Sequence, residues 1–205
     1  MTGEHHEGPL ALAAAVFAAA TLALAGCAAD AQPTPTTGQS SPASADEFLR
    51  THDLAGLDAR QIIDRLDATP LAERPTDLIA SVRPDELLLK GADGAEFTLP
   101  MPADETYVSF APYVEQTHDC YFHSLTTCTG ELRNAVVEVT VTDNATGEVV
   151  HEAEATTFDN GFLGLWLPRG LDGTLTVTAD GLTATAPIAT TGAEDATCLT
   201  TLQLA

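Results

Sequence analysis

The sequence predicts an α+β protein, with a small helical and mixed N-terminal domain followed by a mainly antiparallel, β-sandwich-like C-terminal domain. Apolar residues recur at helical spacing within residues 57–66, as expected for an amphipathic helix. After residue 135, short alternating segments are separated by turns rich in Asp, Asn and Gly. Their spacing of about ten residues is typical of a β-sandwich or an open barrel.

Composition limits the classes of partner. The chain has 205 residues, of which 44% are hydrophobic, so it can bury a core in one domain or two small ones. Its formal net charge is −22, and Lys90 is its one lysine. Nucleic-acid binding needs a basic footprint, which this chain lacks. The acidic residues are spread along the chain, which indicates a solubilising surface.

Residues 1–26 are expected to be a signal peptide. Residues 10–24 form an apolar run that is short for a membrane-spanning helix and suitable for a signal-peptide core. The following L-A-G-C at residues 24–27 resembles a bacterial lipobox, in which the cysteine becomes the acylated N-terminus. No Lys or Arg precedes the run, so either histidines supply the positive charge or translation starts elsewhere. The alternative is a cleaved secretory signal with an incidental Cys27.

The sequence therefore predicts export and lipid anchoring through Cys27 on the outer face of the cytoplasmic membrane. Residues 28–45 are rich in Pro, Ser and Thr without hydrophobic periodicity. Such a composition is typical of a solvated tether. Together with the lipidated cysteine, this disordered tether makes up residues 27–45.

Residues 46–115 are expected to form the N-terminal α+β domain. Asp58 can cap the helix at 59–66, and His52 is expected to be a solvated surface residue. We read this domain as support and as a contact for a homodimer. The expected elements are helices at 46–52 and 59–66, a helical turn at 77–81, a hairpin of 86–90 with 95–99, and a strand at 106–114 that breaks near Pro112.

Residues 116–205 are expected to hold a Cys/His loop and the C-terminal β domain. Phe162 and Trp166 are interpreted as core residues, and the turn pattern loosely resembles Ig-like and transthyretin-like domains. The expected strands lie at 136–142, 148–155, 162–167, 174–178, 182–188 and 198–204.

The segment 116–132 is the richest in side chains that can bind a metal. It holds His118, Cys120, His123 and Cys128, and Cys198 lies near the end of the chain. Four cysteines in an exported protein normally indicate two disulfides. If Cys27 carries lipid, three remain, and at least one thiol is unpaired. A bound metal or redox exchange would give such a thiol a function.

A site of thiolate and imidazole ligands favours Cu(I) or Zn(II), because these ligands are soft. The spacing of Cys120 and Cys128 is not C-x-x-C, so it matches neither a zinc knuckle nor a thioredoxin motif. The alternative is a Cys120–Cys128 disulfide that staples the loop, with Cys198 buried as a small apolar residue. Composition alone does not choose between these. No motif of a hydrolase or kinase is present.

Several motifs together resemble the CueP family of bacterial extracytoplasmic copper-binding proteins. They are T-H-D-C-Y-F-H-S-L-T-T-C-T-G-E-L at 117–132, F-D-N-G-F-L-G-L-W-L-P-R-G at 158–170, T-C-L-T-T-L at 197–202, F-L-x-x-H-x-L-x-G-L-D-A-R at 48–60 and R-P-x-D-L at 74–78. The resemblance implies a copper site built from Cys120, Cys128 and Cys198. It also implies copper tolerance, copper supply to an envelope superoxide dismutase, thiol-driven reduction of Cu(II), and dimers of a two-domain protomer.

The expected cargo is copper, as Cu(I) and as Cu(II) before reduction, with zinc as the weaker alternative. We expect a metal-binding protein rather than an enzyme. His118 and His123 are candidate ligands, His123 being the better one, and the alternative is that both orient the loop by hydrogen bonds. Met101 is the one methionine of the folded part, which excludes a Met-rich site. A thiol-disulfide redox protein and a disulfide-stapled, non-catalytic binding domain remain as alternative functions.

Overall fold

The computed structural model describes residues 42–205, which lie in one compact unit. The predicted signal peptide, Cys27 and residues 28–41 of the predicted tether lie outside the described residues. Among residues 42–205, no helix is long and apolar enough to cross a membrane.

Two helices open the described chain, α1 (Pro42–Thr51) and α2 (Ala59–Asp67). Helix α1 begins inside the predicted tether, four residues before the predicted start. Helix α2 begins where it was predicted, because the Asp58 side chain accepts from the Gln61 N–H while the Gln61 side chain binds the Asp58 N–H. Its apolar face is buried in a first hydrophobic core. Residues of α2 in that core are Ala59, Ile62, Ile63 and Leu66.

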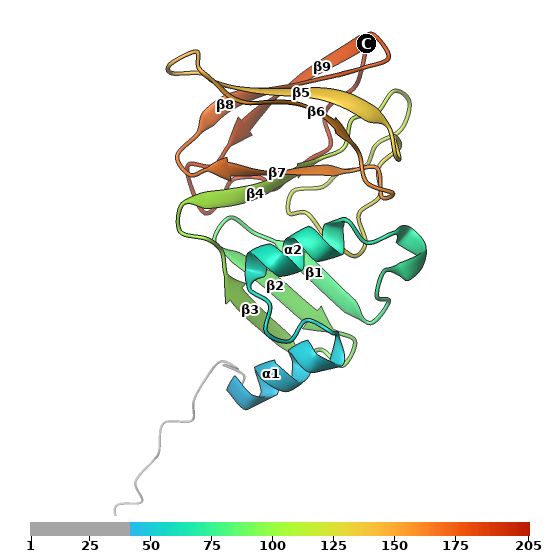
Figure 1. Ribbon diagram of the computed structural model, residues 1–205, viewed down its shortest axis with the longest axis vertical. Helices are drawn as coiled ribbons and strands as arrows, with labels where there is room; N and C mark the ends of the chain where they lie inside the picture. The colour runs from blue at the N-terminus through green and yellow to red at the C-terminus, as the bar shows by residue number, and fades with distance from the viewer. Residues whose placement is uncertain (1–41) are drawn as a thin grey trace, which may run out of the picture. The chain divides into compact units, whose positions relative to one another are not determined.

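A three-stranded antiparallel sheet lies beside α2 (Figure 1). It consists of β1 (Leu78–Val82), β2 (Glu86–Gly91) and β3 (Glu96–Pro100), in that order, and confirms the predicted hairpin. The helical turn predicted at 77–81 is wrong, because this segment is β1. Its residues alternate between buried and less buried positions, a period of two that suits a strand with one face on the core.

The remaining strands form a β-sandwich of two sheets (Figure 1). One sheet has the order β10-β4-β7 and the other the order β6-β5-β8-β9. Apolar side chains of both sheets form a second core between them, so the predicted fold class is confirmed. The strands are β4 (Glu105–Phe110), β5 (Val136–Asp143), β6 (Val149–Thr156), β7 (Leu163–Pro168), β8 (Asp172–Ala179), β9 (Leu182–Ala189) and β10 (Cys198–Leu199).

Strand β4 connects the two cores. It pairs with β7 and β10 in the sandwich, whereas Tyr107 on β4 packs into the core beneath α2. The strand ends at Phe110, just before the predicted break at Pro112. The last predicted strand is much shorter than expected, because only Cys198 and Leu199 pair as β10. The cores are therefore joined at the strand that precedes the Cys/His loop.

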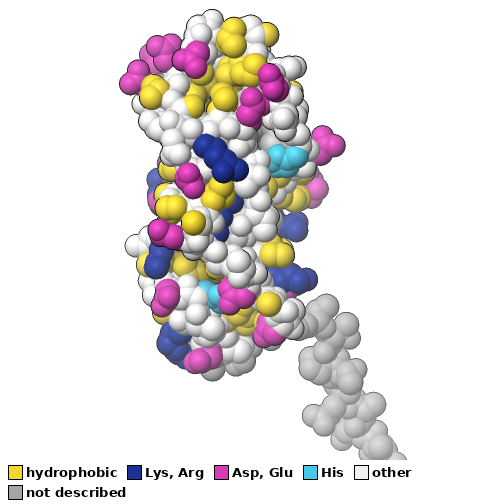
Figure 2. Space-filling view, turned by 90° about the vertical axis from the view of Figure 1, so that its right-hand side faces the viewer, with side chains coloured by type: hydrophobic (Ala, Val, Ile, Leu, Met, Phe, Trp, Pro, Cys, Tyr) yellow, Lys and Arg dark blue, Asp and Glu magenta, His cyan; other side chains and the backbone are white. Residues whose placement is uncertain are grey.

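His52 is not the solvated residue that was predicted, since its side chain is 8% exposed. Its ring lies 4.7 Å from that of Phe48, and its Nδ1 lies 3.8 Å from Asp77 Oδ1. On the face drawn in Figure 2, acidic side chains are scattered among hydrophobic and uncharged ones, as expected for a solubilising surface.

Candidate metal centre

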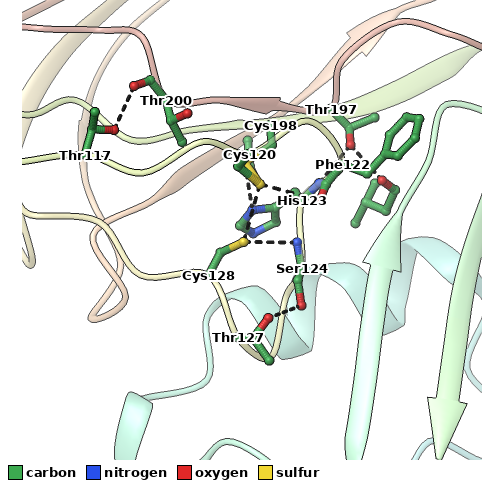
Figure 3. Close-up of a disulfide and its surroundings, with 12 residues drawn as sticks. Thr117, Cys120, Phe122, His123, Ser124, Thr127, Cys128, Thr197, Cys198 and Thr200 are labelled. Atoms are coloured by element: carbon green, nitrogen blue, oxygen red, sulfur yellow. Dashed lines mark hydrogen bonds between the residues drawn. A yellow bond between two sulfur atoms is a disulfide. The ribbon is translucent and has the colours of Figure 1, made fainter.

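The long connection between β4 and β5 holds most of the candidate ligands, and backbone hydrogen bonds fix it. The Val82 N–H donates to the His123 carbonyl, and the Leu125 N–H donates to that of Ala80, each at 2.8 Å. On the other side, the N–H groups of Thr197 and Cys198 both donate to the Tyr121 carbonyl. The loop is thus held between the edge of β1 and the chain that enters β10 (Figure 3).

The three cysteines of the folded part meet in this loop. Cys120 and Cys198 form a disulfide with their Cα atoms 5.7 Å apart, and Cys128 is a free thiol. The Cys128 Sγ lies 3.6 Å from the Cys120 Sγ. The alternative pairing of Cys120 with Cys128 is therefore wrong for this state of the protein. The disulfide joins the Cys/His loop to the last strand, across a sequence separation of 78 residues.

The sulfurs lie against an apolar wall. Cys198 is 2% exposed and packs with Ala111 and Phe162, while Cys120 and Cys128 are half-buried against the same cluster. Phe162 is fully buried, as predicted, and its ring also lies 4.6 Å from the His123 ring. Such a wall excludes water from the inner side of the cluster, where water would otherwise compete with the side chains for a metal.

The two histidines differ in burial and belong to different donor groups. His123 is fully buried, and its Nδ1 lies 3.8 Å from the Cys198 Sγ. His118 is exposed. Two donor groups result, each with its ligand atoms within 4.8 Å of one another. The inner group consists of His123, Cys128 and Cys198, and the outer group consists of His118, Cys120 and Cys128. All five predicted donors of the described chain are therefore brought together, and Cys128 belongs to both groups.

Asp67, the last residue of α2, orients His123. Its carboxylate is fully buried, and its Oδ1 lies 3.1 Å from the His123 Nε2. The same oxygen accepts from the Asn160 Nδ2 at 2.9 Å. The other oxygen accepts from the Tyr107 hydroxyl at 2.7 Å and from the Ser109 hydroxyl at 3.1 Å. With its Nε2 on this carboxylate, the imidazole turns its Nδ1 toward the sulfurs. Carboxylates orient ligating histidines in the same way at metal sites.

A glycine makes room for this network. A Cβ on Gly164 would lie 1.9 Å from the Tyr107 hydroxyl oxygen. Gly164 pairs with Ser109 across β4 and β7, so the Tyr107 side chain passes over a strand position that has no side chain. The glycine of the F-L-G-L segment therefore permits the hydrogen bond to Asp67.

A pair of glycines brings two of the sequence motifs into contact. A Cβ on Gly161, whose φ is +79°, would lie 2.5 Å from the Gly130 carbonyl oxygen. The Gly130 N–H donates to the Asn160 carbonyl at 2.6 Å. The loop after Cys128 and the turn before Phe162 thus touch backbone to backbone, which places Asn160 beside Asp67.

Opposite charges are favoured on His123 and Cys128. Burial lowers the pKa of His123, but the charge and hydrogen bond of Asp67, with a smaller contribution from Cys128, raise that pKa to about 9. Burial raises the pKa of the Cys128 thiol, yet the hydrogen bond and charge of His123 and the Ser124 N–H outweigh it, so the pKa falls. A lowered thiol pKa favours the thiolate, which is the form that binds metals and attacks disulfides.

Arg74 adds a positive charge behind the same thiol. Its Nη1 donates to the Cys128 carbonyl at 2.7 Å. Its Nε and Nη2 are buried and have no hydrogen-bond partner among residues 42–205. The charge of Arg74 also lowers the pKa of Cys128. The R-P-x-D-L motif therefore contributes directly to the loop that holds the free cysteine.

The donor set fits a soft metal. Thiolates and imidazole nitrogens are the ligands preferred by Cu(I) and by Zn(II). The sulfurs lie in an apolar setting, and the inner imidazole is held by a carboxylate. Among the described residues, the clusters able to hold a metal ion are these two groups, and neither contains a carboxylate ligand. Hard cations such as Ca²⁺ and Mg²⁺ are therefore a poor match.

The candidate donors were predicted from the sequence, but the residues that support them were not. Asp67, Asn160, Tyr107, Ser109 and Arg74 were not singled out. Asp67 did leave a signal, because it follows Ile63 by four positions and therefore lies on the apolar face of α2. An acidic residue on a buried helix face needs a polar partner. The other four are recognisable only once the loops are folded.

A sandwich protein with cysteine and histidine donors converging beside a buried carboxylate defines a class: a soft-metal-binding protein. The family model described as "Periplasmic copper-binding protein CueP" matches residues 61–203. The chain belongs to the CueP family, which is extracytoplasmic and binds copper. It is also similar to the crystal structure of S.CueP, with 42% sequence identity and a TM-score of 0.74 over 81% of this chain and 100% of that chain. No curated protein matches the chain.

Proposed function

We propose that this protein binds Cu(I) through the thiolates of Cys120, Cys128 and Cys198. His123 assists from the buried side and His118 from the exposed side. The observation that carries the proposal is the sharing of Cys128 by two donor groups, one buried and one reaching the surface. A copper ion captured by His118, Cys120 and Cys128 can pass inward while Cys128 keeps its hold.

We further propose that the thiols reduce Cu(II) on arrival. Joining Cys120 to Cys198 removes two electrons and releases two protons, and the two electrons convert two Cu(II) to two Cu(I). The disulfide between these residues, beside a free Cys128, is the product that this reaction would leave. Cys128 and the histidines then remain as donors for the Cu(I) that has formed.

A thiol-disulfide redox protein is the second candidate function. It is favoured by the free thiol that lies 3.6 Å from one sulfur of the disulfide. A disulfide-stapled binding domain without chemistry explains the disulfide alone. It leaves the buried pair of Asp67 and His123 without a purpose, although buried charges are costly.

The cellular role follows as part of the same proposal. Export and a lipid anchor at Cys27 would hold the protein on the outer face of the cytoplasmic membrane. The helical front part and the sandwich would act as two domains of a protomer that forms homodimers. The bound copper would protect the envelope or supply an envelope superoxide dismutase.

The decisive experiment is anaerobic competition for Cu(I) on the reduced chain from Ala28 onward, beside its Cys198→Ser variant. One-to-one binding that weakens by more than about hundredfold in the variant is expected, because a thiolate ligand is lost. Binding that the variant leaves unchanged would contradict the three-cysteine site. Thiols are counted in parallel to verify the starting state.

A matched control uses a cysteine outside the site. The Cys27→Ala variant of the full chain keeps the three loop cysteines and should bind Cu(I) as the unaltered chain does. Reduction is tested separately by adding Cu(II) without oxygen. Loss of two thiols for every two Cu(I) formed is expected, and Cu(I) formation without thiol loss would contradict reduction by the cysteines.

A further inference from the structure

We propose that the disulfide of this protein migrates within the Cys/His loop. Cys128 attacks the Cys120 sulfur, the bond from Cys120 to Cys198 breaks, and a Cys120–Cys128 disulfide forms while Cys198 is released as a thiol. This internal exchange would free the buried Cys198 and prepare the disulfide for reduction, which restores the three thiols of the copper site. It rests on the proposed function only in using the same three cysteines.

The short distance between the sulfurs supports the exchange once the Cys128 side chain rotates. The Cys128 Sγ lies within 4.8 Å of the Cys198 Sγ, so it turns to the side of Cys120 that faces away from Cys198 in order to attack in line. The free Cys128 Sγ lies 3.6 Å from the Cys120 Sγ, and Cys120 already shares its disulfide with Cys198. Thiol-disulfide exchange requires a thiolate close to one sulfur of an existing disulfide. Cys120 is the central sulfur of the three, and Cys128 and Cys198 are the two partners that it can take.

The backbone that carries the attacking sulfur is held in place by its surroundings. The Ser124 N–H lies 3.4 Å from the Cys128 Sγ, and the Cys128 N–H donates to the Ser124 carbonyl at 3.0 Å, so residues 124–128 form a tight turn (Figure 3). The Arg74 guanidinium binds the Cys128 carbonyl. Holding two reacting groups in contact raises their effective concentration far above that of any external thiol.

The leaving sulfur also has a partner. The His123 Nδ1 lies 3.8 Å from the Cys198 Sγ, while its Nε2 is hydrogen-bonded to Asp67. An N–H at Nδ1 can donate to the thiolate that leaves Cys120. No electron is gained or lost in the step: one S–S bond forms, one breaks, and the negative charge moves from Cys128 to Cys198.

Burial gives the exchange a consequence. Cys198 is 2% exposed, whereas Cys120 and Cys128 are both half-buried. Migration therefore replaces Cys198, which is 2% exposed, by the half-buried Cys128 as the disulfide partner of Cys120. An external dithiol, small or carried by a protein, can then reduce the bond, and the three thiols are restored for another ion.

The test compares reduction rates in two metal-free oxidised chains that both carry Cys27→Ala, one with and one without Cys128→Ser. Dithiothreitol is added, and thiols are counted after acid quenching at successive times. The chain with Cys128 should be reduced at least about tenfold faster, because the internal thiol acts at high effective concentration. Equal rates would overturn the proposal.

A second measurement maps the isomers directly. The oxidised chain is equilibrated, acid-trapped and alkylated, and it is then cut with pepsin at low pH, where exchange is frozen. Cleavage after Phe122 or Leu125 separates Cys120 from Cys128. The alkyl group should be shared between Cys128 and Cys198, and its confinement to Cys128 would overturn the migration.

Two controls keep the outcome interpretable. If Cys128→Ser does not fold, Cys128 is instead blocked with iodoacetamide in the folded oxidised chain, and reduction should slow by the same factor. Cu(I) affinity of the fully reduced chain is measured separately. If the reduced chain binds Cu(I) tightly but the reduction rate does not depend on Cys128, the migration alone is contradicted. If the reduced chain does not bind Cu(I) tightly, the proposed copper function is contradicted.

Discussion

The two sides of the cysteine cluster differ in how firmly the fold holds them. On the inner side, His123 and Cys198 are buried, and His123 is tied to Asp67, which itself has three further side-chain partners. On the outer side, His118 is exposed and Cys120 is half-buried. The difference suggests a division of work, in which the inner side determines how tightly copper is held and the outer side determines how it arrives.

The largest expected effect comes from breaking the inner side at Asp67. Asp67→Asn should lower the free energy of unfolding by about 3 kcal/mol, because it removes one partner of a buried pair. It should weaken Cu(I) binding by roughly 10- to 100-fold, as loss of a carboxylate behind a ligating histidine does. Urea unfolding and Cu(I) competition measure the two effects.

A control in the same helix separates this effect from damage to α2. Asp64 accepts from the Trp166 Nε1 at 2.7 Å on the exposed side of the helix. Asp64→Asn should leave Cu(I) affinity unchanged. Nitrogen-15 NMR of the imidazole should show the proton of His123 redistributed in Asp67→Asn only. Equal loss of affinity in both variants would contradict a specific role for Asp67.

The pH dependence of stability sharpens the same comparison. His123 has a folded pKa of about 9, above the value of about 6.5 expected for an unfolded histidine. Its stabilising contribution is therefore complete below pH 6.5 and is lost as the pH rises through 9. The Cys128→Ser chain removes the titration of the thiol and also its smaller contribution to the raised pKa of His123. In that chain the free energy of unfolding should fall by about 2 kcal/mol from pH 6 to pH 9, less than the full shift would give.

The control for that titration is the Asp67→Asn,Cys128→Ser chain, in which the main charge that raises the pKa of His123 is absent. Its stability should change little over the same interval. A fall of the same size in both chains would assign the pH dependence to other groups.

A smaller effect is expected from Tyr107. Tyr107→Phe keeps the ring but removes one hydrogen bond to the charged Asp67 carboxylate, which should cost about 1.5 kcal/mol of stability. Cu(I) affinity should stay close to that of the unaltered chain, because His123 keeps its own bond to Asp67. Urea unfolding gives the first value and Cu(I) competition the second, and a large loss of affinity would mean that the Tyr107 hydroxyl itself orients the imidazole.

The smallest effect is expected on the outer side. His118→Ala should leave the free energy of unfolding within about 0.5 kcal/mol, as for most exposed positions. Equilibrium Cu(I) affinity should change only slightly, while capture of copper, followed by stopped-flow competition, should slow. If His118→Ala weakens equilibrium binding more than His123→Ala does, the proposed division between the two sides is reversed.

Local patterns in the sequence predicted most of the fold. Helix α2 was predicted because its cap, Asp58, and its apolar spacing act within a few residues. The hairpin of β2 and β3 and the strands of the four-stranded sheet follow from alternation and turn residues in the same way. Residues 77–81 were misassigned because a five-residue segment between prolines carries too little periodicity to distinguish a turn of helix from a strand.

The sequence by itself also determined the candidate donors. Cysteine and histidine are scarce in this chain and concentrated in residues 116–132, and softness alone then selects the metal class. Only the tertiary structure decided how these donors are arranged. The pairing of Cys120 with Cys198, the contact of Cys120 with Cys128 and the contact of Asp67 with His123 join residues that are 78, 8 and 56 positions apart, respectively. Such contacts depend on how separate elements pack, and no local pattern in the chain encodes them.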